Sequence, residues 1–241
     1  MKKLILTAAA ALALSTGFAS AEDVVRMGTE GAYPPFNFIN DKGEVAGFER
    51  ELGDTLCTKA AVKCTWVTNE WDSIIPNLLG GNYDTIMAGM SITDERKQTI
   101  DFTEAYYPPA ASAYAALKDG ADLKGVVAAQ VGTIQADYVA KSGATLLEFA
   151  TLDDTVAAVK NGEADAVFAD KDALAAFTAD QGGALVWTGE DIPLGEGIGM
   201  GLRKSDTALK EKFNAVITAM KADGSLNVMI KKWFGDDALT F

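Results

Sequence analysis

The order in which strand-like and helix-like segments follow each other limits the fold of this chain more than any other feature. Short apolar runs predict strands at residues 24–29, 64–67, 85–87, 100–103, 126–129, 145–149, 166–169, 185–187 and 198–202. Helical patterns predict helices at residues 49–59, 71–79, 135–141, 151–161, 171–179, 207–222 and 225–234. Strands that alternate with helices indicate an α/β fold with mainly parallel sheets.

Residues 1–21 have the three parts of a secretory signal peptide. Lys2 and Lys3 form the positive start, residues 4–14 form a short apolar stretch, and Ala19-Ser20-Ala21 is a small-residue cleavage site. The apolar stretch is shorter than the about 20 residues that a membrane span needs. We therefore predict an exported soluble protein without direct membrane insertion, cleaved near Ala21.

The chain is acidic, with a formal net charge of −13 that becomes −15 when the two lysines of the signal are removed. Nucleic-acid binding requires a basic surface, so this class of function is excluded. The negative charge mildly favours cationic ligands by steering, although solubility is the larger part of its explanation.

The chain has two cysteines, Cys57 and Cys64, and no histidine. An even pair at short spacing in an exported chain predicts a structural disulfide. A Ser-His-Asp triad is impossible without histidine, and a thiol nucleophile or a metal site would need further partners. The sequence therefore predicts no metal and no cofactor.

Two stretches resemble each other and suggest two similar lobes. Residues 78–89 and 159–170 both read as a helix end, a glycine turn, an aspartate (Asp84 or Asp165) and an apolar strand. Aligning them places Gly89 opposite Asp170, and both follow predicted strands, as Glu30 does. Ligands of open α/β sheets bind at such strand ends. We expect residues 22–109 and 197–241 to form one lobe and residues 110–196, with the two crossings, to form the other.

The charged and aromatic residues at these positions suit a zwitterion with a cationic side chain. Arg96 follows a loop of small residues and offers a fork for a carboxylate. Asp170 offers an anion for an ammonium group, and Thr133 adds donors at a predicted helix start. Glu30, with Tyr33 and Trp71 as aromatic faces, would then hold a cation by charge pairing and cation–π stacking.

Simpler roles are open for each of these side chains. Arg96 alone fits a surface ion pair, and Thr133 and Asp170 fit helix N-caps. Tyr33 and Trp71 fit ordinary half-buried aromatic residues, and Glu30 fits a solvated loop acid.

Several motifs resemble those of the periplasmic polar amino-acid-binding proteins of ABC importers, the solute-binding family 3. They are Gly28-Thr29-Glu30, Tyr33-Pro34-Pro35-Phe36, Gly47-Phe48-Glu49, the cysteine pair, Ala88-Gly89-Met90-Ser91-Ile92-Thr93 with Glu95-Arg96, and Lys232-Trp233-Phe234. The likeness covers essentially the whole mature chain and is strongest to arginine and lysine/arginine/ornithine binders. It implies a type II periplasmic-binding-protein fold, with two α/β lobes joined by two crossing strands, that closes on its ligand.

The resemblance also implies a role for each site residue. Arg96, helped by Thr133 and the amide of Ile134, would hold the α-carboxylate. Asp170, Ser91 and the carbonyl of Gly89 would hold the α-ammonium. Tyr33 and Trp71 would sandwich the side chain of the ligand, and Glu30 would meet its terminal cation. Gln130 and Gln135 would line the far lobe, and the small-residue loop would contribute Ala88 and Met90.

This pattern predicts a monomeric periplasmic receptor, not an enzyme, that binds a basic L-amino acid, arginine first and also lysine or ornithine, for an ABC permease. Ala88 and Gly89, where lysine/arginine/ornithine binders commonly have two serines, also resemble some opine binders. Other polar amino acids remain alternatives. A dehydratase acting on prephenate-like acids or arogenate is a rival on the same fold, with Glu30 for proton transfer. A sensor subunit for a membrane kinase is another.

Overall fold

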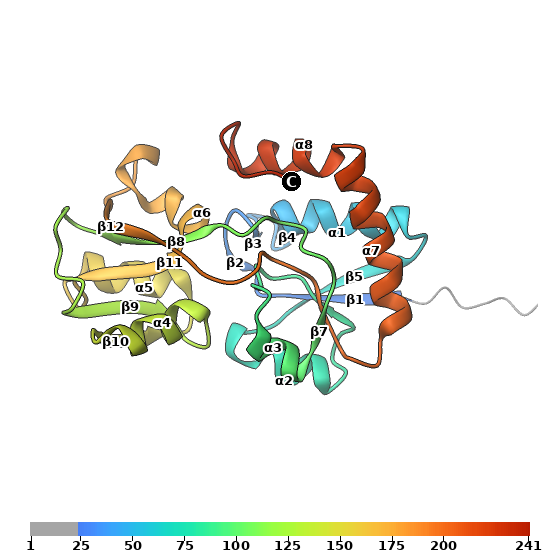
Figure 1. Cartoon of the computed structure of the whole chain (residues 1–241), viewed down its shortest axis with the longest axis horizontal. Helices are drawn as coiled ribbons and strands as arrows, with labels where there is room; N and C mark the ends of the chain where they lie inside the picture. Colours follow the sequence, from blue (N-terminus) through green and yellow to red (C-terminus); the bar gives the residue numbers. More distant parts are fainter. Residues whose placement is uncertain (1–23) are drawn as a thin grey trace, which may run out of the picture.

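The computed structural model describes residues 24–241, so the predicted signal peptide lies outside the described residues. Two lobes are visible, each built around a five-stranded sheet (Figure 1). The first lobe has the strand order β5 (Lys63–Thr68), β1 (Val24–Thr29), β6 (Thr85–Ile86), β13 (Gly201–Leu202) and β7 (Asp101–Phe102). The second has the order β10 (Thr145–Phe149), β9 (Val126–Gln130), β11 (Ala166–Asp170), β8 (Ala111–Ala116) and β12 (Val186–Pro193).

Both sheets are mixed, which corrects the expectation of mainly parallel sheets. β1 runs parallel to β5 and β6, whereas β13 is antiparallel to β6 and β7. Likewise β9 is parallel to β10 and β11, whereas β8 is antiparallel to β11 and β12. The parallel strands come from strand–helix–strand units. The reversed strands are β8, by which the chain enters the second lobe, and β13, by which it re-enters the first.

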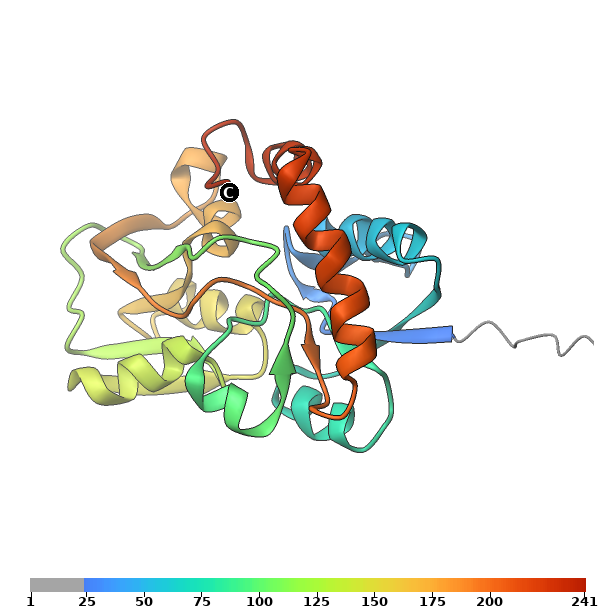
Figure 2. The same cartoon turned by 45° about the vertical axis from the view of Figure 1, so that its right-hand side comes forward.

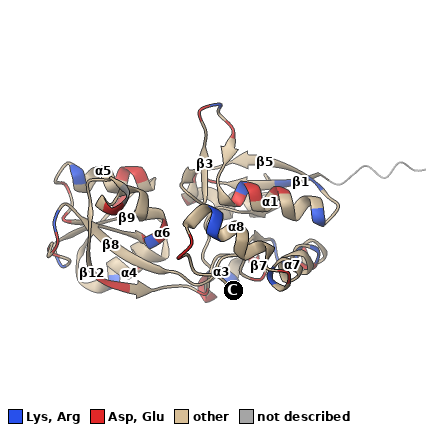
Figure 3. Cartoon of the chain, turned by 90° about the horizontal axis from the view of Figure 1, so that it is seen from above, with Lys and Arg blue, Asp and Glu red and all other residues tan. Residues whose placement is uncertain are grey.

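The helices surround these sheets. They are α1 (Phe48–Lys59), α2 (Ile74–Leu79), α3 (Asp94–Thr99), α4 (Ile134–Ser142), α5 (Leu152–Lys160), α6 (Lys171–Leu174), α7 (Thr207–Ala222) and α8 (Ser225–Phe234). Three short 3-10 segments complete them: η1 (Trp71–Ser73), η2 (Ala175–Phe177) and η3 (Ala179–Gln181). Acidic and basic residues alternate along outer helices such as α1 (Figure 3).

Two predicted helices are less regular than expected. The segment 71–79 starts as the 3-10 turn η1 and becomes α-helical only at Ile74. Pro76 then falls in the first turn of α2, where a missing amide hydrogen is tolerated. The segment 171–179 is one α-helical turn, α6, followed by η2 and the start of η3. The helix α3 has no counterpart among the predicted helices.

An aromatic cluster ties the end of the chain to its beginning. Phe234 of α8 lies 4.8 Å from Phe36 and 5.3 Å from Phe48 between ring centroids, and Tyr107 lies 4.7 Å from Phe234. Phe36, Phe48 and Tyr107 are almost fully buried. Each buried ring contributes about 1.5–3 kcal/mol of transfer free energy. The C-terminal helices α7 and α8 therefore belong to the first lobe, although they follow the second in sequence.

A small antiparallel sheet carries the entrance loop of the first lobe. Its strands are β2 (Ala32–Tyr33), β3 (Asn37–Ile39) and β4 (Val45–Ala46). The Asn40 side chain closes the turn between β3 and β4 by accepting hydrogen bonds from the amides of Lys42 and Glu44.

The internal sequence similarity corresponds to equivalent contacts in the two lobes. The Asp84 carboxylate accepts a hydrogen bond from the Arg26 amide (2.9 Å), and its own amide donates to the Arg26 carbonyl (2.8 Å). Asp165 makes the same two contacts with Val126, at 2.8 and 2.7 Å. Each aspartate therefore holds two neighbouring parallel strands of its own lobe in register.

The predicted disulfide is present in the first lobe. Cys57, near the end of α1, is bonded to Cys64 at the start of β5. It fixes the short connection that turns the chain from helix to strand.

The lobes are connected by the segments that lead into β8 and out of β12. These segments run side by side in Figures 1 and 2, and the pairing of Ser112 with Ile192 joins them at the second lobe. Tyr107 and Ile198 form a bridge closer to the first lobe. Within residues 24–241, the helices are all too short or too polar to cross a membrane.

Candidate functional site

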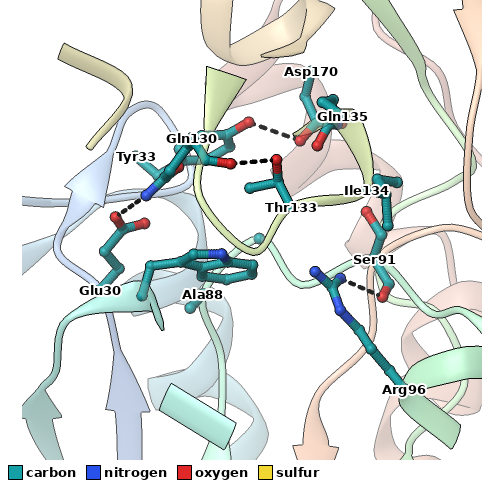
Figure 4. Close-up of a pocket in the computed structure, with 12 residues that line it drawn as sticks. Glu30, Tyr33, Ala88, Ser91, Arg96, Gln130, Thr133, Ile134, Gln135 and Asp170 are labelled. Atoms are coloured by element: carbon teal, nitrogen blue, oxygen red, sulfur yellow. Dashed lines mark hydrogen bonds between the residues drawn. The ribbon is translucent and has the colours of Figure 1, made fainter. Parts of the chain in front are cut away.

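A cavity lies between the lobes, and its walls carry most of the residues that the sequence singled out (Figure 4). Its lining residues are Glu30, Tyr33, Trp71, Ala88, Gly89, Ser91, Arg96, Gln130, Thr133, Ile134, Gln135 and Asp170.

Met90 is the one predicted site residue that does not line the cavity. Its side chain is fully buried in the hydrophobic cluster of the first lobe, next to residues such as Ile86 and Ile100. Its neighbours Ala88, Gly89 and Ser91 line the cavity, while the Met90 side chain packs inward. The Met90 side chain therefore does not face the cavity, and a contact between Met90 and a ligand stays a prediction.

The site residues are gathered by the ends of strands from both sheets. Glu30 directly follows β1, and residues 88–91 follow β6. In the second lobe, Gln130 ends β9 and Asp170 ends β11. The carboxyl ends of parallel strands meet at one edge of a sheet. The cavity lies between that edge of the first sheet and that edge of the second.

Gly89 is held in a conformation that suits glycine. Its φ is +62°, in the left-handed region, and a Cβ atom there would lie 3.3 Å from the ring of Tyr33. The backbone at Gly89 can therefore approach the cavity closely, and the Tyr33 ring fills the space beside it.

Arg96 is a cation without an acidic partner. Its guanidinium donates to the Ser91 carbonyl (2.9 Å) and to the Gly132 carbonyl of the second lobe (3.3 Å), and it lies 5.3 Å from the centre of the Trp71 ring. Among residues 24–241, no carboxylate forms a salt bridge with it. Burial lowers the pKa of Arg96 to about 10. The alternative of a surface ion pair for Arg96 is thus wrong.

Asp170 faces the cavity from the second lobe. Its carboxylate accepts hydrogen bonds from the Tyr33 hydroxyl (2.8 Å) and the Gln135 amide (2.9 Å). Burial raises its pKa to about 6, although these hydrogen bonds and the charge of Arg96 oppose the change. Asp170 occupies the N-cap position of α6, as the alternative expected, but its side chain makes no capping hydrogen bond there and faces the cavity instead.

Thr133 combines both roles that the sequence left open. Its hydroxyl accepts a hydrogen bond from the Ala136 amide (3.1 Å), which confirms it as the N-cap of α4, and donates to the Gln130 carbonyl (2.7 Å). It also lines the cavity beside Ile134. The start of α4 therefore points its free amides toward this space.

Glu30 forms the opposite end of the cavity from Asp170 and Arg96 (Figure 4). Its carboxylate accepts a hydrogen bond from the Gln130 side chain of the second lobe (2.6 Å). Burial raises its pKa to about 7, and the charges of Glu70 and Glu49 act in the same direction, against the hydrogen bond from Gln130. An anion kept out of water in this way favours a cationic partner.

The likeness to known proteins agrees with this geometry. A sequence model of the bacterial extracellular solute-binding proteins, family 3, matches residues 25–236. The chain belongs to that family.

Individual relatives of this family 3 protein match it over nearly its full length. The L-arginine-binding protein of Pseudomonas aeruginosa is 37% identical, and the match covers 98% of each chain. A crystal structure of a periplasmic His/Glu/Gln/Arg/opine family-binding protein from Silicibacter pomeroyi, in complex with lysine, is 68% identical. It has a TM-score of 0.89 and covers 90% of this chain and 100% of its own. An ancestral arginine-binding protein bound to glutamine is 33% identical with a TM-score of 0.80, over 88% of this chain and 98% of its own.

The sequence did not reveal a buried polar network beneath the site of this family 3 protein. In the sequence, Glu49 is the first residue of a predicted helix and the end of the Gly47-Phe48-Glu49 motif, and nothing singles out Asn37. Both are fully buried and hydrogen-bonded to each other at 2.7 Å. The available signal was a carboxylate directly after an apolar Gly47-Phe48 pair, which is unusual for a solvated helix start.

Proposed function

We propose that this protein is a periplasmic receptor for a basic L-amino acid, with arginine preferred over lysine and ornithine, that closes on its ligand and delivers it to an ABC permease. The observation that supports this best is a single cavity lined by three desolvated charged residues. The cation Arg96 and the acid Asp170 lie at one end, and the acid Glu30 lies at the other. An α-carboxylate, an α-ammonium and a cationic side chain would each meet an opposite charge there.

The far end of the cavity supports a guanidinium in particular. The Gln130 amide nitrogen donates both to Glu30 (2.6 Å) and to the Ala150 carbonyl (2.9 Å). The second oxygen of Glu30 and the side-chain oxygen of Gln130 remain as acceptors. A guanidinium has five donors in a planar fork and uses two such acceptors better than an ammonium does. The lysine complex of the 68% identical protein makes lysine the first competitor to test.

Closure follows from the distribution of the charges. Arg96 and Glu30 belong to the first lobe, and Asp170 to the second, so one ligand would touch both. A ligand that contacts both lobes stabilises their closed arrangement by its differential affinity. We place the hinge at the crossings near residues 110 and 196 and propose a monomer, cleaved near Ala21, as the working form.

The cavity favours a single amino acid over an opine. Conjugation at the α-nitrogen would need room beside Gly89, where the Tyr33 ring already lies. An enzyme has one observation in its favour, since the pKa of Glu30 near 7 would also suit a general base. However, the hydrogen-bond partner of Glu30 is an amide from the opposite lobe, and this arrangement suits ligand capture no less than it suits a general base.

Thermal unfolding tests the proposal. The mature protein is stripped of ligand by denaturation and refolding, then heated with arginine, lysine, ornithine, histidine, glutamine, glutamate or octopine. Ligand at 1,000 times its dissociation constant adds about 4 kcal/mol, and at roughly 2–4 °C per kcal/mol the melting temperature rises by about 10 °C.

Arginine should give the largest shift, with glutamine and glutamate without effect. A largest shift with glutamate or glutamine would contradict the role of Glu30, and one with octopine would contradict the argument from Tyr33. Turnover of prephenate or arogenate would show an enzyme. Transport assays with the neighbouring permease, against phosphorylation of a membrane kinase, separate import from sensing.

A further inference from the structure

A buried carboxylate beneath the cavity, that of Glu49, joins the loops that carry two opposite ends of the site. It accepts hydrogen bonds from the Gly89 amide and the Asn37 side chain, both at 2.7 Å, and the Tyr106 hydroxyl also donates to it. Asn37 in turn accepts a hydrogen bond from the Gly31 amide at 2.7 Å. One continuous chain of hydrogen bonds therefore runs from the Gly31 backbone to the Gly89 backbone.

The two ends of this chain are next to groups that face the cavity. Gly31 directly follows Glu30. At the other end, the trans peptide between Ala88 and Gly89 is planar, so an amide hydrogen turned toward Glu49 turns the Ala88 carbonyl to the opposite side. Within residues 24–241, no group donates a hydrogen bond to the carbonyls of Ala88 or Gly89. These two carbonyls are free backbone acceptors beside the cavity that both residues line.

The donors around Glu49 match a carboxylate and nothing else of its size. All three partners donate, two to one oxygen and one to the other. Asn37 cannot turn its amide around, since its oxygen is already used by Gly31. Neither Glu49 nor Asn37 lines the cavity, and both have 0% of their surface exposed. Any effect of Glu49 on the ligand must therefore pass through the two loops.

We propose that Glu49 is a positioning residue that fixes the distance between the Glu30 carboxylate and the backbone acceptors at residues 88–89. It thereby sets the length of the basic amino acid that the site accepts. This inference rests on the proposed function, and it adds a residue that governs ligand length without touching the ligand.

Three variants separate positioning from folding. Glu49→Gln keeps the shape but sets an amide NH₂ against one of the donors. Asn37→Leu removes the link to Gly31 and leaves the contact with Gly89. Tyr106→Phe removes the third donor of the same network, touches neither loop, and serves as the matched control. Calorimetric titrations use arginine with homoarginine and lysine with ornithine, since each pair carries equal charges and differs by one methylene.

A mismatch of one methylene in a fitted pocket changes affinity by about 10- to 200-fold. We expect the wild type and Tyr106→Phe to discriminate at least about 10-fold within a pair, and Glu49→Gln and Asn37→Leu to discriminate less than about 3-fold. A lower stability or a missing distant charge acts alike on both members of a pair, so neither can change this ratio.

A Glu49→Gln protein that discriminates as the wild type does overturns the inference. If that variant does not fold, Asn37→Leu gives the same decision. A wild type that binds these ligands without discriminating within a pair also overturns the inference but leaves the proposed function intact. A wild type that binds none of the four contradicts the proposed function itself.

Discussion

Replacing Glu30 by glutamine should weaken arginine binding and at the same time stabilise the ligand-free protein. Glutamine keeps the shape and can still accept the hydrogen bond of Gln130. It removes one charge-assisted contact to the ligand, worth about 1.5–3 kcal/mol, which is an affinity loss of about 10- to 150-fold. Burial raises the pKa of Glu30 from its ordinary value of 4.5 to about 7. Ionised Glu30 then costs the ligand-free fold up to about 3 kcal/mol at pH 8.

The sign of the pH dependence follows from that change. Between pH 4.5 and 7 the folded protein holds a proton on Glu30 that the unfolded chain has released. The contribution of Glu30 to the free energy of unfolding is therefore fully present below pH 4.5 and is lost as the pH rises through 7. A cationic ligand needs the ionised form, of which only about 3% is present at pH 5.5. Its affinity should rise about 30-fold between pH 5.5 and 8.

Calorimetry at pH 5.5 and 8, with urea unfolding of the ligand-free proteins, measures both effects. Glu70→Gln is the matched control, because it removes the same charge from an exposed position whose field reaches Glu30. We expect its affinity to stay within about 2-fold of the wild type. Arginine bound equally well by Glu30→Gln at pH 8, or a wild-type affinity that does not change with pH, would refute the reasoning.

Three further predictions concern other parts of the molecule. Arg96→Lys should weaken binding by about 2–5 kcal/mol, because lysine lacks the fork that a carboxylate uses, and titration calorimetry would detect unchanged affinity if this is wrong. Replacing Cys57 and Cys64 by alanine should cost about 2–3 kcal/mol in urea unfolding without changing affinity, since neither cysteine lines the cavity. Burial acts to raise the pKa of Asp84, but hydrogen bonds from two arginines outweigh it and lower that pKa to about 2. Its stabilisation of about 2 kcal/mol is present above its ordinary pKa of 3.8 and is lost as the pH falls through 2. In Asp84→Asn, acid unfolding should lack this step.

Much of the site could be predicted because its chemistry is local in the sequence. Glu30, Arg96 and Asp170 are charged residues that follow predicted strands or short loops, and strand ends are where ligands bind in such sheets. Their opposite charges then matched the parts of a zwitterion. The cysteine pair was equally readable, since the spacing of seven residues in an exported chain leaves few other uses.

The remaining features depend on contacts between distant parts of the chain. The direction of β8 and β13, which run against the other strands of their sheets, is decided by where the chain crosses between the lobes, and no local pattern records it. Met90 faces the core because of the turn that Gly89 makes before it. Glu49 looks like an ordinary acid in the first turn of a helix, where the helix dipole favours it. Apart from the apolar Gly47-Phe48 pair before it, the packing of Asn37 and Tyr106 is what shows that it is buried.

The burial of charge also determines which ligands the site can reject. A neutral amino acid leaves Glu30 without a cation, and the acid can respond by taking up a proton. With a pKa of about 7, that proton costs almost nothing at pH 5.5 and about 1.4 kcal/mol, or 10-fold in affinity, at pH 8. Cationic ligands gain about 30-fold over the same interval. The preference for arginine over glutamine should therefore grow by about 300-fold from pH 5.5 to 8. A preference that stays constant would mean that a fixed steric feature, and not the charge of Glu30, selects the ligand.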